Sequence, residues 1–381
     1  MTFPSKLPNV QTTIFTVMSQ LAAEHDALNL SQGFPDFNGP DELLDRVSHY
    51  MKSGHNQYAP MTGVPPLRQA IAAKIASLYD ADVDPDSEIT VTSGATDALF
   101  TAIHTVVNPG DEVIVFDPAY DSYEPAIDLA GGKTVHLPLS SHDFSIDWEL
   151  VESSITPRTR AIILNSPHNP TGAILQDADI AALEALVQRH DLYLISDEVY
   201  EHIVFDGQPH RSLLRYPALR ERAFVISSFG KTYHVTGWKI AYCAAPAQLS
   251  KEFRKVHQYV SFCTVSPMQF ALADFLESSK HHLELAEFYQ VKRDRFRAAI
   301  KDSRFELLPC AGTYFQMVDY SAVSDLPDQE LAHQLTIEKG IASIPVSVFY
   351  ATPPSEQKIL RFCFAKNDET LDSAAEVICR I

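Results

Sequence analysis

Three short polar segments contain the residue types best suited to chemistry: Thr92–Thr96, Ser196–Tyr200 and Ser227–Lys231. The small residues of the first segment leave backbone N–H groups free at a helix start, where an anion binds favourably. A carboxylate such as Asp197 can meet a buried cation, and the lysine that ends the third segment can form a Schiff base when a pocket holds it. Taken one at a time, such segments are more often an ordinary turn, a helix N-cap and a surface lysine.

Each polar segment follows a short apolar run that is typical of a β-strand. The strands predicted in this part of the chain are residues 88–92, 112–116, 134–137, 161–165, 192–196, 223–227 and 239–244. Several are almost continuously apolar, as strands covered on both faces are. Helical patterns at residues 96–107 and 179–189 lie between them, which predicts a three-layer α/β domain with a mainly parallel sheet. Because ligands of such sheets bind beyond the carboxyl ends of the strands, we expect the three segments to converge.

The pattern changes after about residue 247, where helical segments dominate. Helices are predicted at residues 283–300, 328–339 and 367–381, and strands at residues 304–308, 313–318 and 359–364. This mixture predicts a smaller α+β domain in the last part of the chain. The length of 381 residues also suggests two domains, at roughly 150 residues each.

The charge balance argues against several classes of partner. The chain has 30 Lys and Arg and 49 Asp and Glu, which gives a net charge of −19. A surface this acidic repels nucleic-acid backbones and anionic membranes at long range, so we expect neither as a partner. No apolar run approaches the length of a membrane-spanning helix. The five cysteines are widely spaced and form no C-x-x-C, and the N-terminus lacks a signal-peptide core. Both observations predict a cytoplasmic protein with reduced thiols.

Common catalytic motifs are missing, and this argues against further enzyme classes. No G-x-G occurs, which disfavours a hydride-transfer enzyme that uses the dinucleotide fingerprint. Gly230-Lys231-Thr232 looks like the end of a phosphate loop, but Val225 stands where the Walker A pattern requires glycine. H-E-x-x-H and G-x-S-x-G are absent as well. The pair His281-His282 is interpreted as two solvated histidines, so no metal site is expected.

Seven segments, taken together and in order, are similar to those of one enzyme family. They are Asn29–Phe37 (NLSQGFPDF), Asn56–Pro60 (NQYAP), Asn165–Gly172 (NSPHNPTG), Ser196–Tyr200 (SDEVY), Ser227–Thr232 (SSFGKT), Gly312–Phe315 (GTYF) and Arg361–Phe364 (RFCF). Over nearly its whole length the chain resembles the class I aminotransferases, which are pyridoxal 5′-phosphate (PLP) enzymes of fold type I. The QGFPDF sequence is typical of the branch of methionine aminotransferases and kynurenine aminotransferases.

The resemblance implies a definite domain organisation. Residues 31–280 would form the large PLP-binding domain, with three α/β/α layers and a mainly parallel sheet. Residues 281–381 would form the small α+β domain, to which the N-terminal segment 1–30 would contribute. The small domain would close over the substrate and expel water.

The resemblance also implies the residues that hold the reactive part of the cofactor. Lys231 would link covalently to the cofactor and, once displaced by the substrate amine, would carry the proton. Asp197 would pair with the pyridine nitrogen through a charge-assisted hydrogen bond and keep it protonated. Tyr200 and Asn169 would hydrogen-bond the phenolic oxygen of the cofactor, and Tyr120 would stack on its ring.

The cofactor phosphate would lie at the helix start near residue 95. Its ligands would be Gly94, Ala95, Thr96, Ser228 and Lys239. Tyr58 would reach the same phosphate from the neighbouring subunit, so the resemblance implies a homodimer in which two chains complete each site.

Arg361 resembles the arginine that clamps the substrate α-carboxylate. A planar guanidinium matches a carboxylate in two parallel hydrogen bonds, and an arginine between apolar runs is expected to be half-buried. The backbone of Gly33, with Phe34 and Asn169, would complete the binding of substrate. An aromatic pocket of Phe15, Phe34, Tyr58, Tyr120 and Phe262 would favour methionine, aromatic or kynurenine-like side chains, and no second arginine is evident for an acidic one.

The sequence therefore predicts a ping-pong aminotransferase that moves an amino group from an L-amino acid to a 2-oxo acid. Two alternatives remain. The same scaffold could carry out β-elimination on cysteine S-conjugates, or the chain could be a non-catalytic protein that has kept the fold. The second alternative predicts the loss of Lys231, Asp197 or Arg361, and all three are present.

Overall fold

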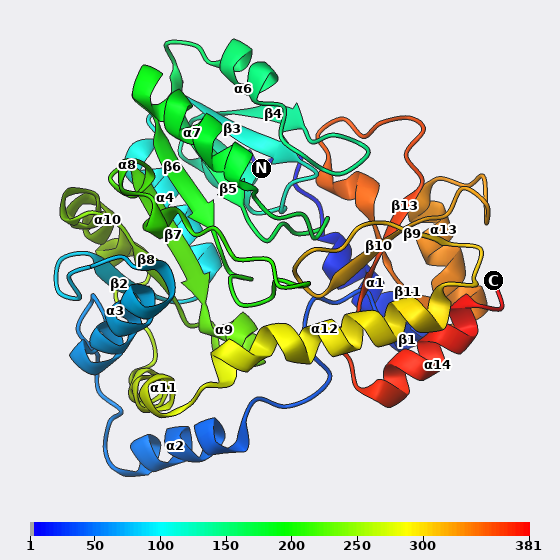
Figure 1. Ribbon diagram of the computed structural model, residues 1–381, viewed down its shortest axis with the longest axis horizontal. Coiled ribbons are helices and arrows are strands. Elements are labelled where there is room, and N and C mark those ends of the chain that lie inside the picture. Colours follow the sequence, from blue (N-terminus) through cyan, green and yellow to red (C-terminus); the bar gives the residue numbers. More distant parts are fainter. Residues whose placement is uncertain (1–3) are drawn as a thin grey trace.

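The computed structural model describes residues 4–381, and its largest element is a seven-stranded sheet in the order β2-β8-β7-β6-β5-β3-β4 (Figure 1). The strands are β2 (Ile89–Thr92), β3 (Glu112–Asp117), β4 (Lys133–Pro138), β5 (Thr159–Asn165), β6 (Tyr193–Asp197), β7 (Ala223–Ser228) and β8 (Ala241–Ala244). Strand β8 runs antiparallel to both of its neighbours, and the other neighbouring strands are parallel. The predicted mainly parallel sheet is confirmed.

The apolar strand residues separate by their alternation into two hydrophobic layers. Ile114 and Ile162 belong to one buried cluster, whereas Val113 and Ala161 belong to the other. This division follows from the period of two in a strand, which sends successive side chains to opposite faces of the sheet. Both layers are apolar because helices cover both faces, so the predicted three-layer architecture is confirmed.

Helices on each side supply the two outer layers (Figure 1). The helices of this part of the chain are α2 (Asp41–Lys52), α3 (Pro65–Tyr79), α4 (Ala95–Val106), α5 (Tyr123–Leu129), α6 (Trp148–Ser154), α7 (Asp177–Arg189), α8 (Pro217–Arg220), α9 (Phe229–Thr232), α10 (Ala247–Val260) and α11 (Ser266–Ser278), with single turns η1 (Leu213–Arg215) and η2 (Thr236–Trp238). Helices α4, α5 and α10 line one hydrophobic cluster, and α3 and α7 line the other.

A second, antiparallel sheet lies in the C-terminal part of the chain, in the order β12-β13-β10-β9. Its strands are β9 (Glu306–Leu307), β10 (Phe315–Asp319), β12 (Ile344–Pro345) and β13 (Ile359–Cys363). The helical elements around it are α12 (His281–Ile300), α13 (Asp328–Gln334), η3 (Leu335–Lys339), η4 (Val346–Phe349) and α14 (Asp368–Ile378). Helix α12 extends from the region of α9 to that of α14, so it connects the two parts of the molecule (Figure 1).

Residues 14–29 lie with the C-terminal part of the chain rather than with the large sheet (Figure 1). Helix α1 (Ile14–Glu24) leads to β1 (Leu28–Asn29), which pairs in parallel with β11 (Ile341–Ala342). This pairing accords with a small domain built from both ends of the chain. The domain boundaries at residues 30 and 280 stay a prediction.

Several local predictions differ from the structure. The helix predicted at residues 328–339 is α-helical to Gln334 and continues as a π-helical turn, η3. The strand predicted from residue 239 begins at Ala241, because Lys239 adopts a left-handed φ of +54°. His281 and His282 are half-buried rather than solvated, and burial lowers the pKa of both, that of His282 to about 4.

Residues 4–381 lack two features that would point to other functions. No helix there is long and apolar enough to cross a membrane. The same residues hold no group of three or more His, Cys, Asp or Glu side chains placed to bind a metal ion.

Candidate active site

A cavity of about 320 Å³ lies at the carboxyl ends of β5, β6 and β7. It is closed on the other side by residues of the N-terminal segment and of the small antiparallel sheet. Its lining includes every residue predicted at the site except Tyr58 and Phe262, namely Phe15, Gly33, Phe34, Gly94, Ala95, Thr96, Tyr120, Asn169, Asp197, Tyr200, Ser228, Lys231, Lys239 and Arg361. The three polar segments therefore do converge beyond the strand ends.

Asp197 ends β6, and its carboxylate lies buried in the floor of the cavity. The Tyr123 hydroxyl donates to Oδ2 over 2.7 Å, and the backbone N–H of Val199 donates to Oδ1 over 3.3 Å. Burial raises the pKa of this carboxyl to about 6, although both hydrogen bonds oppose the shift. Because the two hydrogen bonds offset only part of the cost of burying the charge, this carboxylate is suited to a cationic partner such as a protonated pyridine nitrogen.

Lys231 lies on α9, the single helical turn that follows β7. Its Nζ is 3.0 Å from the Tyr314 hydroxyl and 3.1 Å from the Gly33 carbonyl oxygen. Burial lowers the pKa of the amine to about 8. The amine is therefore partly neutral near physiological pH, whereas an ordinary lysine is almost wholly protonated, and both a nucleophile and a general base require the neutral form.

The start of α4 has the features of an anion site. The first N–H groups of a helix lack intrahelical acceptors, and the helix dipole favours negative charge there. Gly94 precedes the helix with a φ of +90°, and a Cβ at this position would lie 2.9 Å from Cε of Lys239. A glycine is thus needed for the backbone conformation and for the close approach of the lysine. Ser228 completes this side of the cavity.

Aromatic rings form the walls between the anion site and the substrate side. Tyr120 lies edge-on to Tyr123 at 5.7 Å, and burial raises the pKa of Tyr120 to about 12. Tyr200 lies edge-on to Tyr314 at 5.2 Å, and burial raises the pKa of Tyr200 well above its ordinary value. Both cavity tyrosines are therefore neutral hydrogen-bonding groups at neutral pH.

Arg361, in β13, is fully buried, where the sequence suggested a half-buried side chain. Its Nη1 donates to Oδ1 of Asn169 over 2.8 Å and its Nη2 to the Ser31 carbonyl oxygen over 2.9 Å. The guanidinium centre lies 3.9 Å from the ring centroid of Phe315. Burial lowers its pKa to about 10, so it stays cationic at neutral pH.

One donor of this guanidinium is unsatisfied: Nε has no hydrogen-bond partner among residues 4–381. Arg361 lines the cavity and has no carboxylate partner among the hydrogen bonds of the same residues. A buried cation in this state fits an anionic ligand such as a substrate carboxylate.

Tyr58 and Phe262 do not line the cavity of a single chain. Tyr58 is 87% exposed, and its ring centroid is 5.8 Å from that of Phe262. Of the predicted aromatic pocket, Phe15, Phe34 and Tyr120 are in place. A role for Tyr58 at the site stays a prediction that needs a second subunit.

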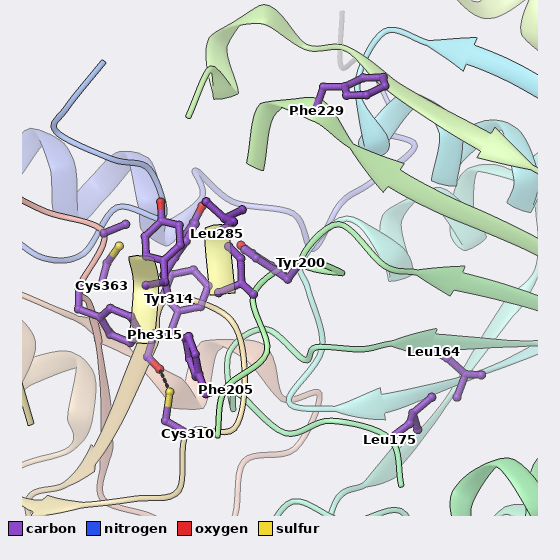
Figure 2. Packing of buried hydrophobic residues seen from close by; sticks show 14 of the residues in the cluster. Leu164, Leu175, Tyr200, Phe205, Phe229, Leu285, Cys310, Tyr314, Phe315 and Cys363 are labelled. Carbon is purple, nitrogen blue, oxygen red and sulfur yellow. Dashed lines mark hydrogen bonds between the residues drawn. The ribbon is translucent and has the colours of Figure 1, made fainter. Parts of the chain in front are cut away.

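Four residues of the site escaped the reasoning from sequence alone. They are Tyr123, which contacts Asp197; Tyr314, which contacts Lys231; and Ser31 and Phe315, which contact Arg361. Tyr314 and Phe315 lie in the GTYF segment, so the resemblance marked their position but not their contacts. Figure 2 shows both rings beside Tyr200, away from the large sheet.

The arrangement fits PLP on structural grounds. A glycine-led helix start beside a lysine suits the phosphate, a buried carboxylate suits the ring nitrogen, and a cavity-lining amine of lowered pKa suits the aldehyde. The residues come from separate parts of the chain but line one cavity.

Comparison with known proteins agrees with this geometry. Residues 25–378 match the family model "Aminotransferase class I and II". The methionine aminotransferase of Escherichia coli (strain K12) is 55% identical over 98% of this chain and 96% of its own length. Human kynurenine–oxoglutarate transaminase 1 is 34% identical over 94% of this chain and 93% of its own.

Solved structures extend the similarity to the fold. A crystal structure from Escherichia coli, for which a methionine aminotransferase function was identified, superposes with a TM-score of 0.98 at 54% identity and covers 100% of both chains. The N-succinyldiaminopimelate aminotransferase of Mycobacterium tuberculosis gives 0.96 at 38% identity, again over 100% of both chains. The chain therefore belongs to the class I and II aminotransferases, which have fold type I and use PLP as their cofactor.

Proposed function

We propose that this aminotransferase takes the amino group of methionine or of an aromatic, kynurenine-like L-amino acid and passes it to a 2-oxo acid in a ping-pong reaction. One observation carries the proposal: a cation for the substrate carboxylate, Arg361, lines the same cavity as the amine of Lys231 and the carboxylate of Asp197. The names of the relatives from Escherichia coli and human support the choice of donors.

In this proposal each residue has a separate task. PLP supplies an aldehyde carbon that takes up the amino group and a ring that withdraws electrons. Arg361 binds the α-carboxylate and fixes the direction of the α C–H bond. The neutral amine of Lys231 would remove the proton from the α-carbon of the donor in the first half-reaction and deliver a proton to the α-carbon of the acceptor in the second. Asp197 keeps a positive charge on the ring nitrogen by hydrogen bonding.

The side chain of the donor is selected by an apolar wall. Phe15, Phe34 and Phe315 line the cavity beside Arg361, and they suit a thioether or an aromatic ring. Among the described residues Arg361 is the one arginine in the lining, and the lysines 231 and 239 already have tasks. A second carboxylate on the donor would then be buried without a cation, which is costly.

We further propose a homodimer in which Tyr58 contributes to the neighbouring site. Large apolar side chains lie exposed on one region of the chain around the end of α10: Tyr58, Tyr259, Val260, Phe262 and Val265. Such a patch typically marks an interface. Tyr58 has no place in the cavity of its own chain, which supports a role across the interface.

A cytoplasmic location is also proposed. All five cysteines of the chain are free thiols in the structure, and Cys379 is exposed. Free, unpaired cysteines of this kind are typical of a reducing compartment.

The two alternatives lack a specific observation in their favour. β-Elimination on cysteine conjugates would use the same Lys231 and Asp197, and nothing in the cavity selects a leaving group. A non-catalytic protein would have no need of a lysine of lowered pKa that lines the same cavity as a buried carboxylate.

The test is a donor panel in the half-reaction without acceptor. Each amino acid is added to the PLP-loaded protein, and the absorbance of the cofactor is followed. Methionine and aromatic donors are expected to convert it fastest, and Lys231→Ala should neither bind PLP covalently nor turn over. Aspartate as the best donor by a wide margin would refute the apolar pocket, and near-normal turnover of Lys231→Ala would refute the mechanism.

A further inference from the structure

A closed triangle of hydrogen bonds surrounds the amine of Lys231. Its Nζ lies 3.0 Å from the Tyr314 hydroxyl and 3.1 Å from the Gly33 carbonyl oxygen. The Tyr314 hydroxyl itself donates to that same carbonyl oxygen over 2.6 Å. The roles of the three groups can therefore be assigned from their hydrogen atoms.

A tyrosine hydroxyl has one hydrogen, and here it is directed to the Gly33 carbonyl oxygen. Toward Lys231 the hydroxyl can then act as an acceptor only. A neutral amine has two N–H groups, and the structure provides an acceptor for each of them. The remaining tetrahedral position of the nitrogen, its lone pair, points away from Gly33 and Tyr314. Since Lys231 lines the cavity while Tyr314 lies behind its wall, that lone pair is available to a bound substrate.

The Tyr314 hydroxyl is held in place by the packing of its ring. The residue is fully buried, and its ring lies 5.2 Å from Tyr200, 4.9 Å from Phe315 and 5.5 Å from Tyr289, between centroids. Figure 2 shows Tyr200 and Phe315 beside Tyr314, with the Cys310 thiol donating to the Phe315 carbonyl oxygen. A ring fixed on several sides cannot swing its hydroxyl away from the amine.

We propose that Tyr314 is a positioning residue for Lys231 in the transamination proposed above. Its hydroxyl, oriented by Gly33, accepts one N–H of the displaced amine and so directs the lone pair of that amine toward the substrate α-proton. The inference rests on the proposed function, because it concerns the same proton transfer. It assigns a task to a residue that does not itself line the cavity.

The test is Tyr314→Phe, which removes the hydroxyl and keeps the ring. In the PLP-loaded enzyme we expect kcat to fall about 10- to 100-fold, less than the loss of the general base itself would cause, while KM changes less than about twofold. The primary isotope effect with α-deuterated donor should increase, because proton transfer becomes more fully rate-limiting.

A second readout uses the full chain without PLP. The pKa of Lys231 is measured from the pH dependence of its labelling by a trace acylating reagent, read by mass spectrometry. The lost acceptor favoured the charged amine, so the pKa should fall, by about half a unit or more. A merely structural role would instead loosen the packing, admit water and raise the pKa.

Tyr289→Phe is the matched control. Tyr289 is buried beside Tyr314, and its hydroxyl has no hydrogen-bond partner among residues 4–381. It should keep the kcat, the isotope effect and the Lys231 pKa of the parent. An unchanged isotope effect, or a Lys231 pKa that stays or rises in Tyr314→Phe, overturns the inference. Failure of the parent enzyme to transaminate any donor would instead refute the proposed function.

Discussion

Lys231 and Asp197 are ionisable groups that line one cavity, and burial shifts their pKa values toward each other. The amine falls to about 8 and the carboxyl rises to about 6, since burial disfavours each charged form. In the protein without cofactor neither charge is well compensated. The residues that suit PLP therefore destabilise the fold when PLP is absent.

This leads to a prediction for Asp197→Asn in the protein without PLP. The carboxyl pKa is higher in the folded chain than in the unfolded one, so its neutral form contributes stability below about pH 4 that is lost as the pH rises through about 6. At pH 7.5 the variant should be more stable than the parent, by up to about 3 kcal/mol for a shift of two units. Urea unfolding at pH 4.5 and 7.5 measures the difference, which should shrink at the lower pH.

Asp177→Asn is the control for that prediction. Asp177 is exposed, and its hydrogen bond to Arg211 lowers the carboxyl pKa. Its pH effect has the opposite sign: stability is present above the unfolded pKa and is lost as the pH falls. No stabilisation is expected at pH 7.5. Equal stability of Asp197→Asn and the parent at every pH would show that the buried carboxylate carries no penalty.

Reasoning from the local sequence identified site residues only where they directly follow a predicted strand. Asp197 and Lys231 each follow an apolar strand, and that local pattern marked them. Tyr123 and Tyr314 have no such pattern, and their partners lie 74 and 83 residues away along the chain. A contact between distant residues is set by packing, which the local sequence does not encode.

At the scale of elements, a β-strand could be predicted from the sequence only when it was long enough to show a residue pattern. The strands of the large sheet are four to seven residues long and rich in β-branched residues, so their pattern is visible. Strands β1, β11 and β12 have two residues each, which is too short to show any period. The strands predicted at residues 304–308, 313–318 and 359–364 do correspond to β9, β10 and β13, whereas β12 and the pairing of β1 with β11 were visible only in the structure.

The link between β2 and α4 allows a test of the anion site. Gly94→Ala combines backbone strain at φ +90° with a clash against the Lys239 side chain. We expect the dissociation constant of PLP to rise about tenfold or more, as for the loss of one good charge-assisted hydrogen bond. Titration of the protein with PLP, followed by absorbance, measures it.

Gly110→Ala separates strain from the clash. Gly110 has the same φ of +90°, but a Cβ there would meet no atom within 4 Å. This variant should lose about 1 kcal/mol of stability and bind PLP like the parent. If both variants weaken PLP binding equally, the close approach of Lys239 has no part in the anion site.

A buried ion pair anchors the turn that carries Tyr200. Lys74 of α3 donates to Glu201, which also accepts from Tyr79 and Ser227. Burial by itself would raise the pKa of Glu201, yet the neighbouring ammonium of Lys74 brings it below its ordinary value. The pair is therefore ionised and depends on both partners.

Lys74→Met should destabilise the protein by about 3–5 kcal/mol, because Glu201 is left as an uncompensated buried charge. The double variant Lys74→Met/Glu201→Gln should recover part of this loss, and urea unfolding measures both. Lys255→Met breaks an exposed pair with Glu252 and should cost less than about 1 kcal/mol. A double variant less stable than the single one would contradict the electrostatic explanation.

At the scale of the whole molecule, the predicted site is incomplete in one chain. Tyr58 is 87% exposed and lies outside the cavity, in a region of exposed apolar side chains. If two chains complete each site, each site takes its Lys231 from one subunit and its Tyr58 from the other. A substitution of Tyr58 in one subunit then impairs the site that holds the Lys231 of its partner subunit. The oligomeric state and the site chemistry can then be tested together.

The experiment uses Tyr58→Ala and Lys231→Ala, co-expressed with different tags and purified through both tags. Each variant alone should be weak, since Tyr58→Ala loses a phosphate hydrogen bond worth about 1.5–3 kcal/mol and Lys231→Ala loses the reactive amine. The hybrid combines Lys231 of one subunit with Tyr58 of the other in one of its two sites. At limiting PLP it should show about half of the parent activity per dimer.

The hybrid distinguishes three arrangements. If Tyr58 acted within its own chain, one site of the hybrid would lack Lys231 and the other would lack Tyr58. The hybrid would then be as weak as the two single variants. If the chain were monomeric, no doubly tagged species would be recovered. Activity restored in the hybrid therefore requires both a stable dimer and a Tyr58 that reaches across its interface, because neither property alone can reassemble an intact site.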